Sequence, residues 1–184
     1  LGFPPRDLEE SLAQQTSILA VTAEALAQIP ALDPQRTGVY VGMCVDPQVA
    51  RHGLRVRLQE LLAGEADTEG WRAVNSKAAR HLTAAGVLGC MPNIPANRLH
   101  TQQDWTAPGF TVASEELSGT EALKLAVMAL QAGDIDAAVV GASDFSNEGA
   151  NEAAARVVFP EDRQSPGDAA VALVVMREVD AHAG

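Results

Sequence analysis

The candidate thiol nucleophiles in this sequence are its two cysteines, Cys44 and Cys90. A cysteine becomes a good nucleophile when a base or a helix N-terminus lowers the pKa of its thiol. None of the histidines stands beside a cysteine or a serine in a motif; they are His52, His81, His100 and His182. We therefore interpret both cysteines as structural, with Cys44 as the alternative nucleophile because it follows a strand-like segment and could reach the carboxyl edge of a sheet.

The other polar residues form no recognised catalytic or metal-binding pattern. Ser118-Gly119 does not fit the Gly-x-Ser-x-Gly nucleophile elbow. Two cysteines provide neither a zinc spacing nor a disulfide framework. Asp134 and Asp136 fit a turn between a helix and a strand better than a metal site, and Ser143-Asp144 could contact a ligand from a loop. We expect no metal and no cofactor.

Charge and hydropathy exclude several classes of function. The chain has 184 residues with 24 acidic and 13 basic side chains, a formal net charge of -11. That balance argues against a general nucleic-acid surface, which needs clustered Lys and Arg. No apolar run approaches the roughly 20 residues of a membrane span. The cysteine usage fits a reducing compartment, so we expect a cytoplasmic protein.

One short basic stretch stands out against the acidic background. Arg51, Arg55 and Arg57 lie within seven residues of one another in a predicted helix. Such a stretch usually forms a solvated helix face. The alternative is a docking patch for an acidic partner such as an acyl carrier protein.

Helical and strand-like segments alternate along the chain, which predicts a doubly wound α/β layer. Asp7 is predicted to cap the first helix, and Pro30 to end it. The expected helices cover Asp7–Ile29, Pro47–Leu62, Trp71–Thr83, Ala96–Gln103, Glu115–Ala132 and Glu148–Val158. The expected strands are Thr37–Val45, Phe110–Ala113, Asp136–Ala142 and Asp168–Met176. The segment from Gly86 to Pro95 is expected to be irregular, and residues 63–70 to form a polar loop.

Seven short motifs, in this order and spacing, resemble the β-ketoacyl synthase family. They are the early helix with Gln14-Gln15 and Glu24-Ala25-Leu26, Thr37-Gly-Val-Tyr-Val-Gly42, Pro95-Ala-Asn-Arg-Leu99, Pro108-Gly-Phe-Thr-Val112 leading to Ser118-Gly-Thr-Glu-Ala-Leu123, Ala129-Leu-Gln-Ala-Gly-Asp134, Ala138-Val-Val-Gly141, and Gly167-Asp-Ala-Ala-Val-Ala-Leu-Val-Val175. The resemblance covers nearly the whole chain.

The resemblance implies the N-terminal half of a thiolase-like fold. That fold is a layered α/β sheet flanked by helices, mostly parallel with an antiparallel last strand. Residues 1–184 would form a single half domain. The family's first strand would precede Leu1, and its histidine-bearing second half would follow Gly184. A start without Met suggests a piece of a longer protein.

The same resemblance places Glu116 where the family has its catalytic cysteine. In the family, a thiolate takes an acyl group from a carrier protein, and two histidines promote decarboxylation of a malonyl unit. A carboxylate is a poor nucleophile toward a thioester. We therefore expect Glu116 in the first turn of its helix and no catalytic residue in this chain.

Among subfamilies, the replacement resembles chain length factors and ketosynthase-like regions of polyunsaturated-fatty-acid or polyketide synthases. The implied role is non-condensing: the chain pairs with an active ketosynthase, or with a second copy, and helps to shape the acyl tunnel. The family dimerises through the strand that matches Phe110, Thr111, Val112 and Ala113, so this strand is the predicted interface.

Two alternatives remain open. Some loading-type domains carry Gln instead of cysteine and decarboxylate malonyl units. Glu116 matches Gln in length, but its charge would repel a malonyl carboxylate. The other alternative is a degenerate ketosynthase fragment that serves as a structural platform within a megasynthase.

Overall fold

The computed structural model describes residues 2–46, 82–147, 149–165 and 167–181, together with the single positions 49, 53, 57, 69, 70 and 73. Most of the helix predicted over residues 47–62, of the loop over 63–70 and of the helix over 71–83 therefore lies outside the described residues. The described strands are β1 (Thr37–Gly42), β2 (Gly109–Val112), β3 (Ala137–Phe145) and β4 (Asp168–Met176). The described helices are α1 (Pro5–Glu9), α2 (Ala13–Leu26), α5 (Ala84–Cys90), α6 (Ile94–Gln103), α7 (Ser118–Ala132), α8 (Gly149–Val158) and α9 (Glu178–Ala181), with a 3₁₀ turn at Glu161–Arg163.

The four strands form one sheet in the order β2-β1-β3-β4. β1 pairs in parallel with β2 on one side and with β3 on the other. β4 runs antiparallel to β3, with Ala137 opposite Met176 and Phe145 opposite Asp168. This topology confirms the predicted thiolase-like half: three parallel strands and an antiparallel last one.

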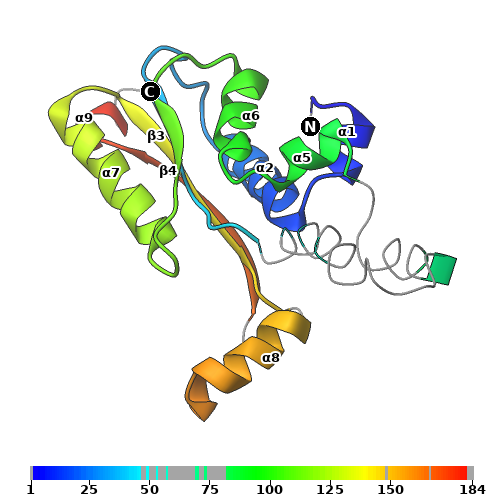
Figure 1. The fold of residues 1–184 in the computed structure, drawn as a ribbon. Coiled ribbons are helices and arrows are strands. Elements are labelled where there is room, and N and C mark those ends of the chain that lie inside the picture. The colour runs from blue at the N-terminus through cyan, green and yellow to red at the C-terminus, as the bar shows by residue number, and fades with distance from the viewer. Residues whose placement is uncertain are drawn as a thin grey trace.

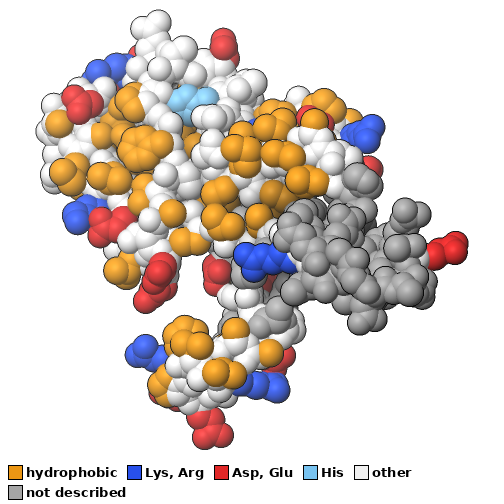
Figure 2. Space-filling model, in the orientation of Figure 1, with side chains coloured by type: hydrophobic (Ala, Val, Ile, Leu, Met, Phe, Trp, Pro, Cys, Tyr) orange, Lys and Arg blue, Asp and Glu red, His pale blue; other side chains and the backbone are white. Residues whose placement is uncertain are grey.

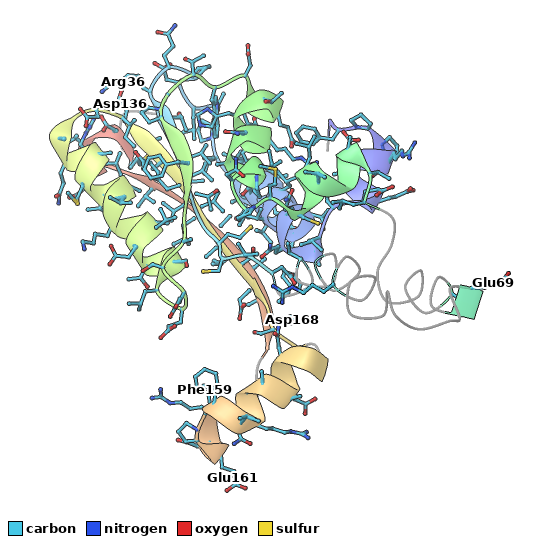
Figure 3. The ribbon with its side chains drawn as sticks, in the orientation of Figure 1. Arg36, Glu69, Asp136, Phe159, Glu161 and Asp168 are labelled. Carbon is cyan, nitrogen blue, oxygen red and sulfur yellow. The ribbon has the colours of Figure 1, made fainter. Side chains whose placement is uncertain are left out.

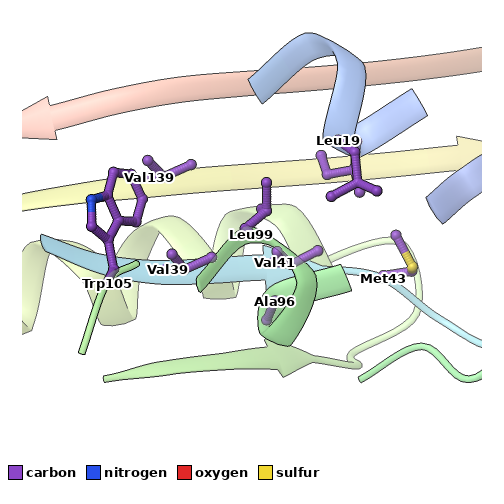
Figure 4. Close-up of a cluster of buried hydrophobic side chains, with 9 residues drawn as sticks. Leu19, Val39, Val41, Met43, Ala96, Leu99, Trp105 and Val139 are labelled. Atoms are coloured by element: carbon purple, nitrogen blue, oxygen red, sulfur yellow. The ribbon is translucent and has the colours of Figure 1, made fainter. Parts of the chain in front are cut away.

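Helices cover both faces of the sheet, as the apolar runs of the inner strands require. Figure 1 shows α7 on one side of the sheet and α2 with α6 on the other. Alternate side chains of β1 point into two separate cores: Val39 and Val41 into one, Tyr40 into the other. The first core, shown in Figure 4, also receives Leu19 from α2 and Leu99 from α6. Every residue of β1 is buried, so β1 is the central support of the fold.

The first predicted helix is wrong in one respect, because two helices occupy its span. Asp7 lies inside α1 rather than capping it, and Leu12 before α2 has an extended backbone. The break is stabilised from outside the segment. The backbone N–H of Leu12 donates to the carbonyl of Gly89 at 3.0 Å. A tertiary contact thus overrides the local helix preference of this region.

The same contact explains why the stretch predicted to be irregular contains a helix, α5. A Cβ on Gly89 would lie 2.5 Å from the carbonyl oxygen of Glu10, so only glycine lets α5 approach the break between α1 and α2. Thr83 caps α5 by accepting a hydrogen bond from the backbone N–H of Gly86. The glycines that suggested a loop serve close packing instead.

A charge cluster holds the N-terminal ends of β1 and β3 to the C-terminal end of β4. Asp136, in the turn between α7 and β3, accepts hydrogen bonds from Arg36 and Arg177. Figure 3 shows Arg36 and Asp136 beside each other at this end of the sheet. Arg177 also donates to the carbonyls of Leu130 and Ile135, both at 2.9 Å. These donors hold the pKa of Asp136 well below its ordinary value, with the hydrogen bond from Arg36 the larger cause.

At the opposite end of the sheet, β3 and β4 extend past their neighbours and carry α8. Figure 2 shows that α8 projects from the rest of the molecule, with open space between this helix and the sheet with its other helices. Several apolar side chains of this region are exposed; they are Val157, Val158 and Phe159.

Candidate functional site

The candidate site is the elbow between β2 and α7, where the strand ends at Val112 and the helix begins at Ser118. Glu115 has a left-handed backbone with φ of 51°, which is uncommon for a residue other than glycine. Glu116 therefore lies two positions before α7, and its predicted place in the first helical turn is wrong. The chain needs a sharp turn here to pass from the sheet to the helix, and Glu115 provides it.

The hydroxyl of Ser118 holds the elbow closed. Its Oγ accepts a hydrogen bond from the backbone N–H of Ser114 at 2.9 Å and donates to the carbonyl of Glu115 at 2.5 Å. The backbone N–H of Leu117 donates to the carbonyl of Ser114 at 3.0 Å. This network satisfies backbone groups that a strained turn would otherwise leave without partners. The sequence analysis considered Ser118 only as a nucleophile and missed this structural role. The available signal is a serine at a helix start, four residues after another serine.

Two glycines let the elbow sit directly against the sheet. A Cβ on Gly42, the last residue of β1, would lie 2.4 Å from the backbone of both Ser118 and Gly119. A Cβ on Gly119 would lie 2.8 Å from the side chain of Ala142 in β3. The first turn of α7 therefore lies on the carboxyl ends of β1 and β3 at a distance that only glycine allows.

The thiol of Cys44 faces this elbow from the segment after β1. Its Sγ lies 3.3 Å from Ser118 Oγ and 3.7 Å from the carbonyl oxygen of Glu115. Because Ser118 donates its own proton to Glu115, the single proton of the Cys44 thiol is directed at Ser118 Oγ or at the Glu115 carbonyl. Cys44 is half-buried. The geometry makes it a support for the elbow, and no histidine lines a hollow with it among the described residues.

Glu116 is exposed, and its side chain borders two hollows. One, of about 510 Å³, is lined from β1, the elbow, β3 and β4 and includes Gly42, Cys44, Ser118 and Asp144. The other, of about 460 Å³, is lined by Cys44 and the elbow itself. Among the described residues no histidine lines either hollow. The Cys44 thiol contacts Ser118 Oγ and the Glu115 carbonyl and is not hydrogen-bonded to an imidazole or carboxylate among the described residues, so the site can contact a ligand but shows no nucleophile–base pair.

His100 lies elsewhere, on α6 against the start of β2. A Cβ on Gly109 would overlap the His100 ring, 2.2 Å from its Nε2. Burial lowers the pKa of His100, and its Nε2 has no hydrogen-bond partner among the described residues. The ring thus belongs to the packing beneath the edge strand. His52, His81 and His182 fall outside the described residues.

The other predicted sites have mixed outcomes. β2 lies at one edge of the sheet, and Phe110 on it is 43% exposed with its ring edge-on to Tyr40 at 5.2 Å. Whether Phe110 to Ala113 form a dimer interface stays a prediction. Arg57 is exposed, whereas Arg51 and Arg55 fall outside the described residues.

Metal and membrane features are absent from the part of the chain that the structure describes. It contains no group of three or more His, Cys, Asp or Glu side chains that could hold a metal ion. No helix within those residues is long and apolar enough to cross a membrane.

Comparison with known proteins gives a consistent result. The family model for the β-ketoacyl synthase N-terminal domain matches residues 1–178. A search of curated proteins found no match. The chain is similar to a solved structure described as the PfaC keto synthase-chain length factor, with a TM-score of 0.82, 20% identity, and coverage of 92% of this chain and 21% of that one.

Two further solved structures are similar in fold. One is a type II polyketide synthase acyl-carrier protein in complex with its ketosynthase bound to the hexaketide, AntDE:AntF (TM-score 0.71, 18% identity, 99% of this chain and 52% of that one). The other is the ishigamide ketosynthase/chain length factor (TM-score 0.65, 17% identity, 97% of this chain and 49% of that one). The chain thus spans about half, or less, of the length of these proteins.

Proposed function

Because this chain belongs to the β-ketoacyl synthase family, we propose that it is a non-condensing component of the chain length factor type in a fatty-acid or polyketide synthase. In this role it pairs with an active ketosynthase and shapes the acyl tunnel of that partner. The proposal rests on Glu116, an exposed carboxylate in the strand-to-helix elbow, at the position that the sequence resemblance assigns to the family's nucleophile.

The chemistry of the elbow supports a non-condensing role. Attack on a thioester needs a thiolate or an activated hydroxyl. The carboxylate of Glu116 is a weak nucleophile, and an anhydride formed from it would hydrolyse. The hydroxyl of Ser118 and the thiol of Cys44 both donate their protons within the elbow, and neither is hydrogen-bonded to a histidine or carboxylate side chain among the described residues.

The edge strand β2 supports the pairing. An edge strand presents unpaired backbone N–H and C=O groups that another strand can join. β2 carries an exposed aromatic side chain, Phe110, and no charged residue within Gly109–Val112. Two of the similar structures are described as ketosynthase–chain length factor proteins, and one contains an acyl-carrier protein. By analogy, Arg51, Arg55 and Arg57 would dock an acidic acyl carrier protein.

The association is tested by light scattering on the chain, alone and mixed with a candidate ketosynthase subunit. Replacing Phe110 by Arg should abolish pairing, because a charge on the edge opposes strand addition. The matched control is Val179→Arg in α9, an exposed apolar residue near the opposite edge of the sheet. If the chain scatters as a monomer at high concentration, both alone and mixed with each ketosynthase subunit tested, the proposed pairing is contradicted.

The tunnel-shaping role is tested on products. A reconstituted synthase that contains the wild-type protein should release acyl products of one defined length. With Phe110→Arg the product lengths should become mixed. Product lengths that do not depend on the chain's presence would refute this role even if the two proteins associate.

A further inference from the structure

The open edge of β2 is formed by the backbone groups of Gly109 and Thr111. The carbonyls of Pro108 and Val112 accept hydrogen bonds from N–H groups of β1 and of the residue that follows it, both at 3.0 Å. Backbone groups of successive residues in a strand point to opposite sides, so those of Gly109 and Thr111 point away from β1. A partner strand that extends the sheet would therefore bond to these two residues.

The same two residues rest on α6. Val112 packs against the other core, on the α7 side of the sheet, so by alternation Gly109 and Thr111 face α6. The ring of His100 lies against Gly109, where a Cβ would come within 2.2 Å of its Nε2. Leu99, the preceding residue of α6, is buried in the first core (Figure 4), which fixes the helix that carries the ring.

A proton on the Nε2 of His100 would have no acceptor. This buried nitrogen has no hydrogen-bond partner among the described residues, and neither has the buried Oγ1 of Thr111, so the two atoms are not bonded to each other. Protonation would place a positive charge in a buried position with nothing to accept its hydrogen bond. Burial accordingly lowers the pKa of His100, and a hydrogen bond with the Trp105 backbone offsets only part of that shift.

The elements packed against α6 are β1, β2 and α2, and β2 has no ionisable side chain within Gly109–Val112. The described ionisable side chains of the other elements, and of α6 with its last capping residue, are not among the causes that shift the pKa of His100. They are Tyr40 on β1, which points into the core on the opposite face, the exposed Glu24 on α2, Arg98, which donates to the Ser11 hydroxyl, and the exposed Asp104. The protonation of His100 therefore depends on whether β2 covers its ring.

We propose that β2 can pair with a partner strand only while His100 is neutral, and that protonation of His100 releases β2 from α6. Once exposed, the ring has its ordinary pKa of about 6.5, so the released state gains as the pH falls. Because one proton separates the two states, the ratio of docked to released β2 is highest above about pH 6.5. It should fall by up to tenfold per pH unit below that value and level off below the pKa of the docked ring. The inference rests on the proposed function for the partner strand alone, and it adds regulation by pH to that pairing.

Amide hydrogen exchange, followed by NMR on the ¹⁵N-labelled chain alone, measures the release of β2. The backbones of Phe110 and Val112 face β1, so their amides exchange only when the strand opens. Their protection factors, corrected for the intrinsic pH dependence of exchange, should fall roughly fivefold to tenfold between about pH 7.5 and about pH 5.5.

Two variants separate His100 from the other titrating groups. His100→Phe keeps an aromatic ring beneath Gly109 and removes the titrating nitrogen, so the protection of β2 should no longer depend on pH in this range. Gly109→Ala adds a Cβ that overlaps the ring; it should lower the protection at every pH and raise the pKa of His100, read by NMR, toward 6.5. This second variant decides the matter if His100→Phe does not fold. The matched control is Gly149→Ala, where nothing lies within 4 Å of the new Cβ and both readouts should stay unchanged.

Light scattering with a ketosynthase subunit at the same two pH values tests the consequence for pairing. The affinity should weaken by the same factor in the wild type and stay constant in His100→Phe. Equal protection of β2 at both pH values in the wild type would overturn the inference, as would a pH dependence that persists in His100→Phe or a wild-type affinity that does not change with pH. The exchange measurement uses no partner. A chain that pairs with nothing would therefore contradict the proposed function, while exchange alone would still decide whether His100 releases β2.

Discussion

The methyl group that Gly42→Ala adds should disturb the elbow more than a methyl group added at any other position of the sheet. The new Cβ would meet backbone atoms of Ser118 and Gly119 at 2.4 Å, where ordinary contact begins at 3.4 Å. The start of α7 would have to move by about 1 Å. None of the three nearest obstructing atoms belongs to a flexible side chain, so relaxation is expensive. Overpacking of this kind costs about 1–3 kcal/mol.

Urea unfolding of wild type and Gly42→Ala measures this cost. The midpoint should fall without a change in slope, and Tm should drop by roughly 2–12 °C, given about 2–4 °C per kcal/mol for a chain of this size. Gly149→Ala is the matched control, because nothing lies within 4 Å of a Cβ at that helical position. If Gly42→Ala were as stable as Gly149→Ala, the close packing of elbow on sheet would be refuted.

Two further perturbations test the contacts that hold the sheet and the elbow. Asp136→Asn should destabilise the chain at neutral pH. Because Arg36 and Arg177 depress the pKa of Asp136 in the folded state, the wild-type advantage should be present above the ordinary carboxyl pKa of about 3.9 and vanish as the pH falls toward the folded value. High salt should reduce this advantage, since Asp136 is 41% exposed; a pH-independent difference would contradict the ion-pair account. Ser118→Ala leaves the N–H of Ser114 without its partner and should cost about 1–3 kcal/mol in urea unfolding, whereas an unchanged midpoint would show that the hydroxyl does not hold the elbow.

Much of the fold was predictable because the strands carry strong local signals. The apolar run that forms β3 indicated a strand covered on both faces, and the first five residues of β3 are buried. The last predicted strand, β4, has the predicted bounds, Asp168–Met176. α7 ends at the predicted residue, Ala132, and Gly133 directly after it has the left-handed conformation that glycine favours at helix ends. These features depend on residues close in sequence.

The errors arose where a distant contact or a specific turn conformation, and not periodicity, decides the local structure. The break between α1 and α2 depends on Gly89, more than 70 positions later, which no periodicity reveals. The late start of α7 depends on a left-handed Glu115 and on the Ser118 hydroxyl, whereas two glutamates ahead of a helical pattern favour helix by propensity. The buried Gln14 Nε2, which has no hydrogen-bond partner among the described residues, could not be foreseen either, because Gln14 and Gln15 are neighbours in sequence and differ only in what surrounds them.

The most direct test of the central claim is the intact mass of the chain after incubation with an acyl-carrier thioester. The account predicts no acyl adduct on Glu116 or Cys44, and no turnover of malonyl thioester. The Glu116→Cys variant is the positive comparison. Its new thiol stands just before α7, where a helix N-terminus lowers a cysteine pKa below about 8.5, so it should be alkylated faster than Cys90, whose pKa burial raises. An adduct on the unmodified chain, at Glu116 or at Cys44, would contradict the non-condensing assignment.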